Sequence, residues 1–183
     1  TASGKTPFAA HLAHHLGDAE IISADSRMVY RGMTIGSGKD LDDYVVDGHH
    51  IPYHLIDICE AGYRFNVYEF QCAFQNAFMD ITARGQLPIM CGGTGLYIES
   101  VLKSYELGQV RFPERNSLTI GLSIERDLRR EKISRRLKAR LEEGMIEEVQ
   151  TLLQTVSAEK LIRYGLEYKF VTLYCLGQLS YDE

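Results

Sequence analysis

The sequence predicts an α/β fold in which helices flank a parallel β-sheet and a helical part follows. Three observations predict it: a glycine-lysine-threonine loop stands directly before the first helical segment, helical and strand-like segments then alternate, and a later strand runs into a second glycine-rich loop. Helix, strand, glycine loop and helix in this order are typical of a doubly wound parallel sheet. We place the α/β core at residues 1–123 and the helical part, packing on that core, at residues 124–183.

The first helix is expected over residues 7–16. Pro7 stands in its first turn and Gly17 directly follows it, which are typical start and stop signals. The short apolar run over residues 20–24 then predicts a buried strand that ends at Asp25. The helical assignment depends on apolar side chains that recur at four-residue spacing, namely Phe8, Leu12 and Leu16.

The same unit recurs later in the chain, with a helix expected over residues 66–83 and a strand over residues 87–91. A third strand is expected over residues 117–123. A long helical stretch follows, with a break at Gly144, and residues 161–183 are also expected to be helical. The long stretch presents one apolar face, formed by Ile133, Leu137, Leu141, Ile146, Val149 and Leu153.

Composition describes a globular, soluble chain. Of its 183 residues, 45% are hydrophobic and 25% charged, and no apolar run is long enough to span a bilayer, so we expect no membrane role. The four cysteines form no CxxC pair, which favours free thiols in a reducing compartment and hence a cytoplasmic protein, which we take to be a monomer. Because the chain opens at Thr1 without an initiator methionine, we expect further residues to precede it.

Charge is distributed unevenly along the chain. The net charge of -5 argues against a surface covered with phosphate-binding residues, yet residues 126–140 contain eight basic and only two acidic side chains. Such a cluster is either a binding surface for an anionic ligand or the solvated face of a helix. The cluster by itself leaves both interpretations open.

The first six residues carry the most informative motif. They match the last six positions of the phosphate-binding loop GxxxxGK[ST], whose backbone N–H groups bind phosphate at a helix N-terminus. Lys5 would reach the terminal phosphates and Thr6 would hold Mg²⁺. The motif predicts a P-loop NTPase-like, nucleotide-binding (ATP-binding) core, but kinases, NTPases and transferases share it, and an ordinary helix start is the alternative. The predicted diphosphate-binding loop is Thr1, Ala2, Ser3, Gly4, Lys5 and Thr6.

Asp25 closes the strand that follows this helix. The carboxyl ends of adjacent parallel strands face one crevice, so Asp25 and the phosphate-binding loop are expected to share a site. A carboxylate there can accept a proton or hold magnesium. The alternative is that Asp25 and Ser26 simply cap the following turn.

Five further motifs occur in order along the chain, and together they resemble the tRNA dimethylallyltransferase family. The resemblance covers nearly the whole chain, and five motifs in order after a phosphate-binding loop are much more specific than any one of them. They are DSRMVYRGM at 25–33, IGSGK at 35–39, IPYHLID at 51–57, GGTGLY at 92–97, and GLS at 121–123 leading into ISRR at 133–136.

The resemblance implies a prenyl transfer. A dimethylallyl group would move from dimethylallyl diphosphate to the exocyclic N6 amine of an adenosine in tRNA, next to the anticodon. Asp25 would be the general base, while Lys5 and a magnesium ion on Thr6 would stabilise the departing diphosphate. The implied partners are therefore tRNA and dimethylallyl diphosphate.

The resemblance also implies roles for residues outside the loop. Lys39 and Arg136 would contact diphosphate oxygens, although either could be surface charge. The glycines at 92, 93 and 95 would allow close backbone approach, although a plain strand-to-helix turn is the alternative. The predicted substrate and RNA contacts are Ser26, Arg27, Tyr30, Gly93, Thr94 and Gly95.

The chain departs from the family pattern in three places. The family usually carries a long helical insertion that grips the anticodon arm, whereas this sequence has a short stretch near 106–116, and the basic, aromatic tail is missing after Glu183. Met28 stands where many members have Gln. Alternative functions are therefore an adenylate (free nucleotide) isopentenyltransferase, a P-loop small-molecule kinase, and a non-catalytic RNA-binding remnant.

Overall fold

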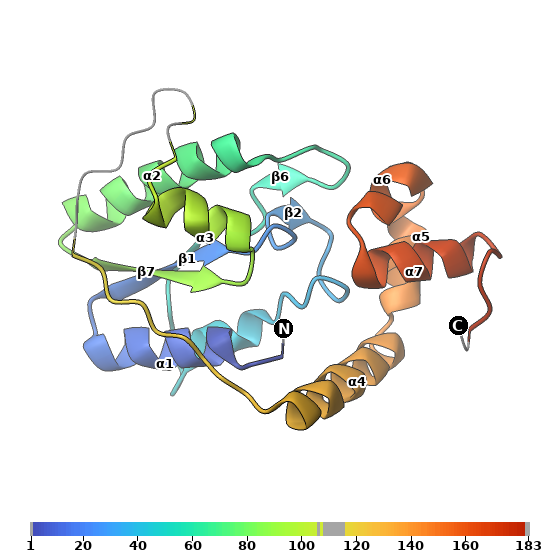
Figure 1. Cartoon of the computed structure of the whole chain (residues 1–183), viewed down its shortest axis with the longest axis horizontal. Helices are drawn as coiled ribbons and strands as arrows, with labels where there is room; N and C mark the ends of the chain where they lie inside the picture. The colour runs from blue at the N-terminus through green and yellow to red at the C-terminus, as the bar shows by residue number, and fades with distance from the viewer. Residues whose placement is uncertain (1, 106, 108–115, 182–183) are drawn as a thin grey trace.

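A computed structural model describes residues 2–105, 107 and 116–181. Its centre is a three-stranded parallel sheet in the order β5-β1-β7 (Figure 1). The middle strand, β1 (Ala19–Ala24), pairs with β7 (Leu87–Gly92) over its whole length and with β5 (Tyr53–His54) over two residues. All six residues of β1 are buried, as expected for a strand covered on both faces.

Helices cover both faces of this sheet. The first, α1 (Lys5–Leu16), packs on one face, while α2 (Val67–Ala83) and α3 (Gly95–Leu102) lie on the other. Successive side chains of a strand point to opposite faces, so Ile21 joins the apolar cluster beneath α1 and Ile22 joins the cluster beneath α2 and α3. The predicted helix, strand, glycine loop and helix are therefore confirmed.

Sequence features explain where these helices begin and end. Gly4 and Gly17 flank α1 in the left-handed conformation, with φ of 76° and 79°. Asn66 caps α2 in a capping box with Glu69, in which each side chain accepts a hydrogen bond from the backbone N–H of the other residue. Glycines therefore mark both ends of α1, and the capping box marks the start of α2.

Between β1 and α2 the chain forms small elements that build one side of the site. The strand β2 (Tyr30–Arg31) pairs in parallel with β6 (Cys59–Glu60). A 3₁₀ turn, η1 (Leu41–Tyr44), leads into the antiparallel pair of β3 (Val45–Val46) and β4 (His49–His50).

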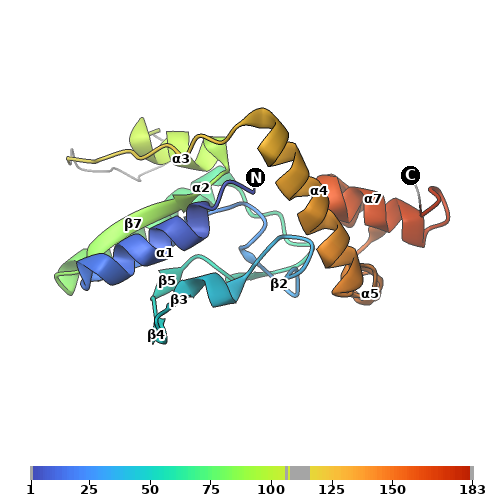
Figure 2. The same cartoon turned by 90° about the horizontal axis from the view of Figure 1, so that it is seen from below.

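Over the described residues 116–181 the chain forms four helices, α4 (Arg126–Glu142), α5 (Met145–Leu152), α6 (Ala158–Arg163) and α7 (Leu166–Cys175). Figure 2 shows α4 leading from the α/β core to the other three. The predicted break falls at Gly144, where φ is 103°. These helices share a buried cluster with Val29, Tyr30 and Met33 from the segment after β1, so they pack on the core.

The strand expected over residues 117–123 is wrong. Residues 116–125 form neither helix nor strand, and they run along the outside of the core to α4. Leu118 is 87% exposed there and Ile120 is 50% exposed. Apolar residues favour a strand where they pair with a sheet edge and pack against a covering layer, and the described part of this segment pairs with no strand and leaves its apolar side chains exposed.

The buried carboxylate of Glu20, on β1, bonds Arg84 and His54 and makes the stability of the fold depend on pH. Glu20 is 4% exposed, and its carboxylate accepts hydrogen bonds from Arg84, with Nη2 at 3.0 Å, and pairs with His54 Nε2 at 2.7 Å. The hydrogen bond from Arg84 lowers the pKa of Glu20 below the ordinary value of 4.5. Stability from the charged form is therefore present above pH 4.5 and is lost as pH falls through the lower pKa of the folded state.

We expect Glu20→Gln to lower the free energy of unfolding by about 2 kcal/mol at neutral pH, because it removes a buried, hydrogen-bonded charge. The difference from wild type should shrink below pH 4.5. Urea unfolding across this range measures both. Asp80→Asn is the control, because this exposed carboxylate also bonds Arg84, at 2.8 Å. A difference that does not change with pH would contradict the assignment.

Candidate active site

The glycine-lysine-threonine loop forms a concave turn at the start of α1. Ala2 and Gly4 have positive φ values of 56° and 76°, and alternation of left-handed and other conformations turns successive N–H groups toward one side. The Lys5 ammonium donates a hydrogen bond to Ser3 Oγ at 3.2 Å. Free N–H groups at a helix N-terminus and a nearby ammonium suit a phosphate ligand.

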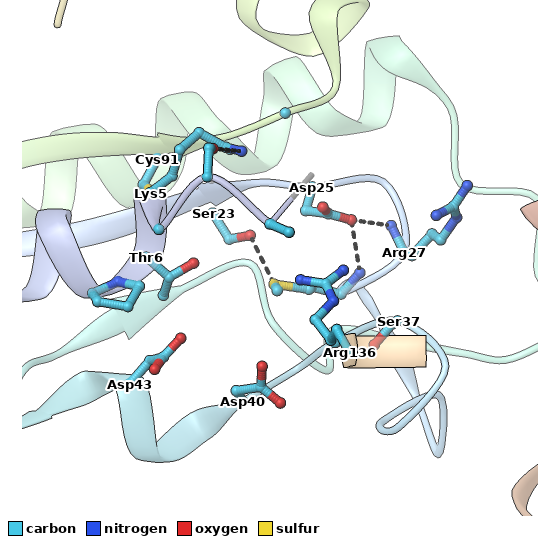
Figure 3. Close-up of a pocket in the computed structure, with 18 of the residues that line it drawn as sticks. Lys5, Thr6, Ser23, Asp25, Arg27, Ser37, Asp40, Asp43, Cys91 and Arg136 are labelled. Carbon is cyan, nitrogen blue, oxygen red and sulfur yellow. Dashed lines mark hydrogen bonds between the residues drawn. The ribbon is translucent and has the colours of Figure 1, made fainter. Parts of the chain in front are cut away.

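Asp25 follows β1 directly, and its carboxylate has two functions. Oδ1 accepts hydrogen bonds from the backbone N–H of Arg27 at 2.9 Å and of Met28 at 3.4 Å, so it caps the turn. The carboxylate also lines the same pocket as Lys5 and Thr6 (Figure 3). The two interpretations of Asp25 are therefore compatible, because the turn bonds hold the carboxylate at the rim of the sheet.

Two strand ends meet at this rim. The Thr94 backbone N–H, just after β7, bonds the carbonyl of Ala24 at 3.2 Å, and Thr94 Oγ1 accepts a hydrogen bond from the Ser26 N–H at 2.9 Å. The Thr94 hydroxyl also donates to Ser26 Oγ at 3.2 Å. Gly92 is required for this close approach, because a Cβ there would lie 2.4 Å from the Ala24 backbone.

These elements surround an open pocket of about 780 Å³. The phosphate-binding turn and the rim of the sheet form two sides of it (Figure 3). Residues from α4 and α7 line another side. Of the predicted site residues, those that line the pocket are Ala2, Ser3, Gly4, Lys5, Thr6, Asp25, Ser26, Arg27, Gly93, Thr94 and Arg136.

Three predicted site residues are not brought to the pocket, and Thr1 lies outside the described residues. Lys39 is 4% exposed, and its ammonium donates to the Tyr30 carbonyl at 2.7 Å and pairs with Asp57 at 2.5 Å. Tyr30 itself is buried in the cluster beneath the C-terminal helices. Gly95 begins α3, beyond the pocket edge. The Lys39 ammonium therefore links its own segment to Tyr30 and Asp57, outside the pocket.

Sequence reasoning missed several pocket residues, notably Ser37, Asp40 and Asp43. Their position in the sequence was the available signal, because Ser37 lies within the IGSGK motif and Asp40 and Asp43 follow that motif within a few residues. Burial raises the pKa of Asp43 above its ordinary value, and the charges of Asp40 and Asp42 add to this effect. The remaining residues that were missed include Ser23, Tyr44, Cys91, Lys132, Arg135 and Glu167.

The basic run on α4 divides into an exposed first part and a second part that borders the pocket, so each interpretation describes one part of it. Lys132, Arg135 and Arg136 line the pocket, while residues 126–131 are exposed. Arg140, in contrast, is 3% exposed and contacts Glu167 at 3.5 Å. The helix therefore presents cations to a pocket ligand and also presents a solvated basic surface.

The oxygen donors in the pocket fit a magnesium ion that also binds a diphosphate. The Thr6 hydroxyl and the Asp25, Asp40 and Asp43 carboxylates line the pocket. Within the described part of the chain, no group of three or more His, Cys, Asp or Glu side chains is arranged to hold a metal by itself. Magnesium commonly binds through one or two protein oxygens, substrate phosphates and water, which this open set allows.

The fold is that of the class of α/β proteins in which helices flank a parallel sheet, and its pocket lies at the carboxyl ends of the strands, where such proteins commonly bind their ligands. The family is defined by sequence: the model described as IPP transferase matches residues 28–117 and 108–183. The chain therefore belongs to the IPP transferase family.

Curated relatives support this membership. The chain is 48% identical to tRNA dimethylallyltransferase 1 of Azobacteroides pseudotrichonymphae and 49% identical to tRNA dimethylallyltransferase 1 of Parabacteroides distasonis, with all of this chain aligned to 79% and 78% of theirs. The first alignment spans 243 positions against 183 residues here, so 60 positions have no counterpart in this chain. The predicted missing insertion near 106–116 falls largely outside the described residues and stays a prediction.

Solved structures show the same fold. The tRNA isopentenylpyrophosphate transferase of Bacillus halodurans matches all of this chain over 77% of its own, with a TM-score of 0.79 and 28% identity. The tRNA delta(2)-isopentenylpyrophosphate transferase of Staphylococcus epidermidis matches with a TM-score of 0.81 and 25% identity, over 80% of its own chain.

Proposed function

We propose that this chain acts as a tRNA dimethylallyltransferase and that transfer takes place in the pocket between Lys5 and Asp25. It moves a dimethylallyl group from dimethylallyl diphosphate to the N6 amine of an adenosine next to the anticodon. The observation that carries this proposal is that the phosphate-binding turn and the Asp25 carboxylate line one pocket. The names of the curated relatives support the choice of reaction.

The phosphate-binding turn stabilises the leaving group. As the bond between C1 of the prenyl group and the diphosphate oxygen breaks, the diphosphate keeps the electron pair and gains negative charge. The N–H groups at the start of α1 and the Lys5 ammonium lie where they can bind this anion, and such preorganised donors lower a barrier most effectively. A magnesium ion held by Thr6 would add positive charge when bound.

Asp25 receives the proton. The adenosine N6 forms a bond to C1, becomes acidic as it does so, and loses one proton to the carboxylate. Because Oδ1 is fixed by the Arg27 and Met28 N–H groups, the carboxylate keeps its orientation in the pocket. A general base needs such a position within hydrogen-bond reach of its proton donor.

The remaining pocket residues bind the two substrates. Arg136 supplies a planar cation for the diphosphate from α4. Ser26, Arg27, Gly93 and Thr94 lie at the rim where the target base enters once it leaves its stack. The exposed basic residues of α4 contact the RNA backbone.

We also propose that the protein works in the cytoplasm as a monomer and has no membrane role. In the described part of the chain, every helix is too short or too polar to cross a membrane.

Labelled dimethylallyl diphosphate tests the function directly. The protein with Mg²⁺ is incubated with labelled donor and either tRNA or AMP, and label is counted in each acceptor. Label in the adenosine of tRNA is expected. Label in AMP alone would identify a free nucleotide transferase, and phosphoryl transfer from ATP without prenyl transfer would identify a kinase. A tRNA that lacks adenosine next to the anticodon is the matched control.

A further inference from the structure

The Glu148 carboxylate, on α5, is bound by a loop from the α/β core. Oε2 accepts hydrogen bonds from the N–H groups of Thr34 at 2.9 Å and Ile35 at 2.7 Å, and Oε1 accepts from the Gly36 N–H at 3.1 Å. The Tyr168 hydroxyl on α7 donates to Oε1 at 2.7 Å. Consecutive N–H groups that converge on one anion form a concave binding site, and a carboxylate from this chain fills it.

These hydrogen bonds complete a loop that is otherwise held by its own turns. The Gly38 N–H bonds the Ile35 carbonyl at 3.1 Å, and the Lys39 N–H bonds the Thr34 carbonyl at 3.0 Å. Ser37 Oγ donates to the Met33 carbonyl at 2.6 Å. We call residues 34–38 the Glu148 loop. Its turns fix its internal shape, while Glu148 fixes its position on the C-terminal helices.

The Glu148 loop has little freedom to lie elsewhere. A Cβ at Gly36 would stand 2.7 Å from the Tyr168 ring, and one at Gly38, where φ is +70°, would stand 1.8 Å from Arg140 Nη2. The backbone is therefore in close contact with two buried side chains of α4 and α7. Glu148, Tyr168 and Arg140 together form the surface on which the loop rests.

The other side of the Glu148 loop faces the pocket. Gly36, Ser37 and Gly38 line it, and Figure 3 shows Ser37 across the pocket from Lys5 and Thr6. In a displacement, the nucleophile approaches opposite the leaving group. If the diphosphate lies in the turn around Lys5, the amine comes from the side of the pocket that the loop borders.

We propose that Glu148 is a positioning residue for the acceptor adenosine, which it serves by holding the Glu148 loop in its pocket-facing conformation. The proposal rests on the function proposed above. Glu148 does not itself line the pocket, so it acts through the loop. Loss of its charge should weaken acceptor binding and leave donor binding unchanged, because the proposed donor site is built by α1, the rim of the sheet and Arg136, and the hydrogen bonds of Glu148 go to Thr34, Ile35, Gly36 and Tyr168 instead.

Two variants and one control test this role. Glu148→Gln replaces a charged acceptor of several bonds by an amide, and should raise the KM for tRNA about tenfold. Tyr168→Phe removes one of the four bonds and should raise it about threefold. Glu147→Gln makes the same charge change on an exposed neighbour in α5 and should behave as wild type. The KM for dimethylallyl diphosphate should stay within about twofold in all three.

Hydrogen exchange of the peptide that covers the Glu148 loop is a second readout, and it does not require activity. Faster exchange at residues 34–36 in Glu148→Gln and Tyr168→Phe, but not in Glu147→Gln, is expected. Unchanged exchange, an unchanged KM for tRNA, or an equal rise in both KM values would overturn the proposal. If Glu148→Gln fails to fold, Tyr168→Phe carries the same expectation. Wild-type protein without transferase activity would instead refute the proposed function, while exchange would still report on the loop.

Discussion

Asp25→Asn is expected to lower kcat for prenyl transfer about a thousandfold and to leave both KM values nearly unchanged, because it removes the general base and little else. The asparagine oxygen can still accept the hydrogen bonds from Arg27 and Met28 that shape the turn. The loss should therefore appear in the chemical step. Single-turnover transfer of labelled dimethylallyl to tRNA, with enzyme in excess, measures that step.

Asp42→Asn is the matched control for this experiment. It makes the same chemical change to an exposed carboxylate of η1 that does not line the pocket. We expect a change in rate of less than about tenfold there. If Asp25→Asn kept a rate within about threefold of wild type, Asp25 would have only its role as a cap of the turn.

Lys5→Met is expected to lower kcat/KM for dimethylallyl diphosphate by about two to three orders of magnitude. It removes the cation of the phosphate-binding turn and keeps most of the length of the unbranched side chain. Because charge on the diphosphate grows as the bond breaks, we expect the larger part of the loss in kcat. Steady-state rates over a range of donor concentrations, at saturating tRNA and Mg²⁺, separate the two parameters.

Lys103→Met provides the comparison for Lys5. That lysine follows α3, is exposed, and pairs with Glu99 at 2.5 Å, away from the pocket. The same substitution there should leave kcat/KM unchanged. A similar loss in both variants would show that general charge, rather than the ammonium in the turn, accounts for the effect.

Much of the site could be predicted because the order of loops, helices and strands along the chain determines which segments meet at one edge of a parallel sheet. A glycine-lysine-threonine loop before a helix, and a carboxylate after the next strand, meet at the same edge of any parallel sheet. Lys5, Thr6 and Asp25 therefore line one pocket, as their order along the chain implied. Gly93, directly after β7, obeys the same rule, whereas Gly95 lies beyond the pocket.

The parts that sequence could not supply depend on contacts between distant segments. Lys39 carries a cation that could bind phosphate. Its ammonium instead donates to the Tyr30 carbonyl and pairs with Asp57, and no feature of the neighbouring sequence indicates these contacts. The segment at 117–123 has the apolar content of a strand, yet pairing depends on which sheet edge is within reach. Glu148 lies more than a hundred residues from the loop that it holds.

The apolar cluster that joins Val29, Tyr30 and Met33 to α5, α6 and α7 makes the two parts of the chain one cooperative unit. The segment directly after Asp25 has its hydrophobic support in helices at the opposite end of the sequence. A boundary at residue 123 thus separates an α/β portion from a helical portion without separating two independent cores. We therefore expect sequence changes in α5 or α7 to disturb the position of Asp25, the proposed proton acceptor, even when they touch no substrate.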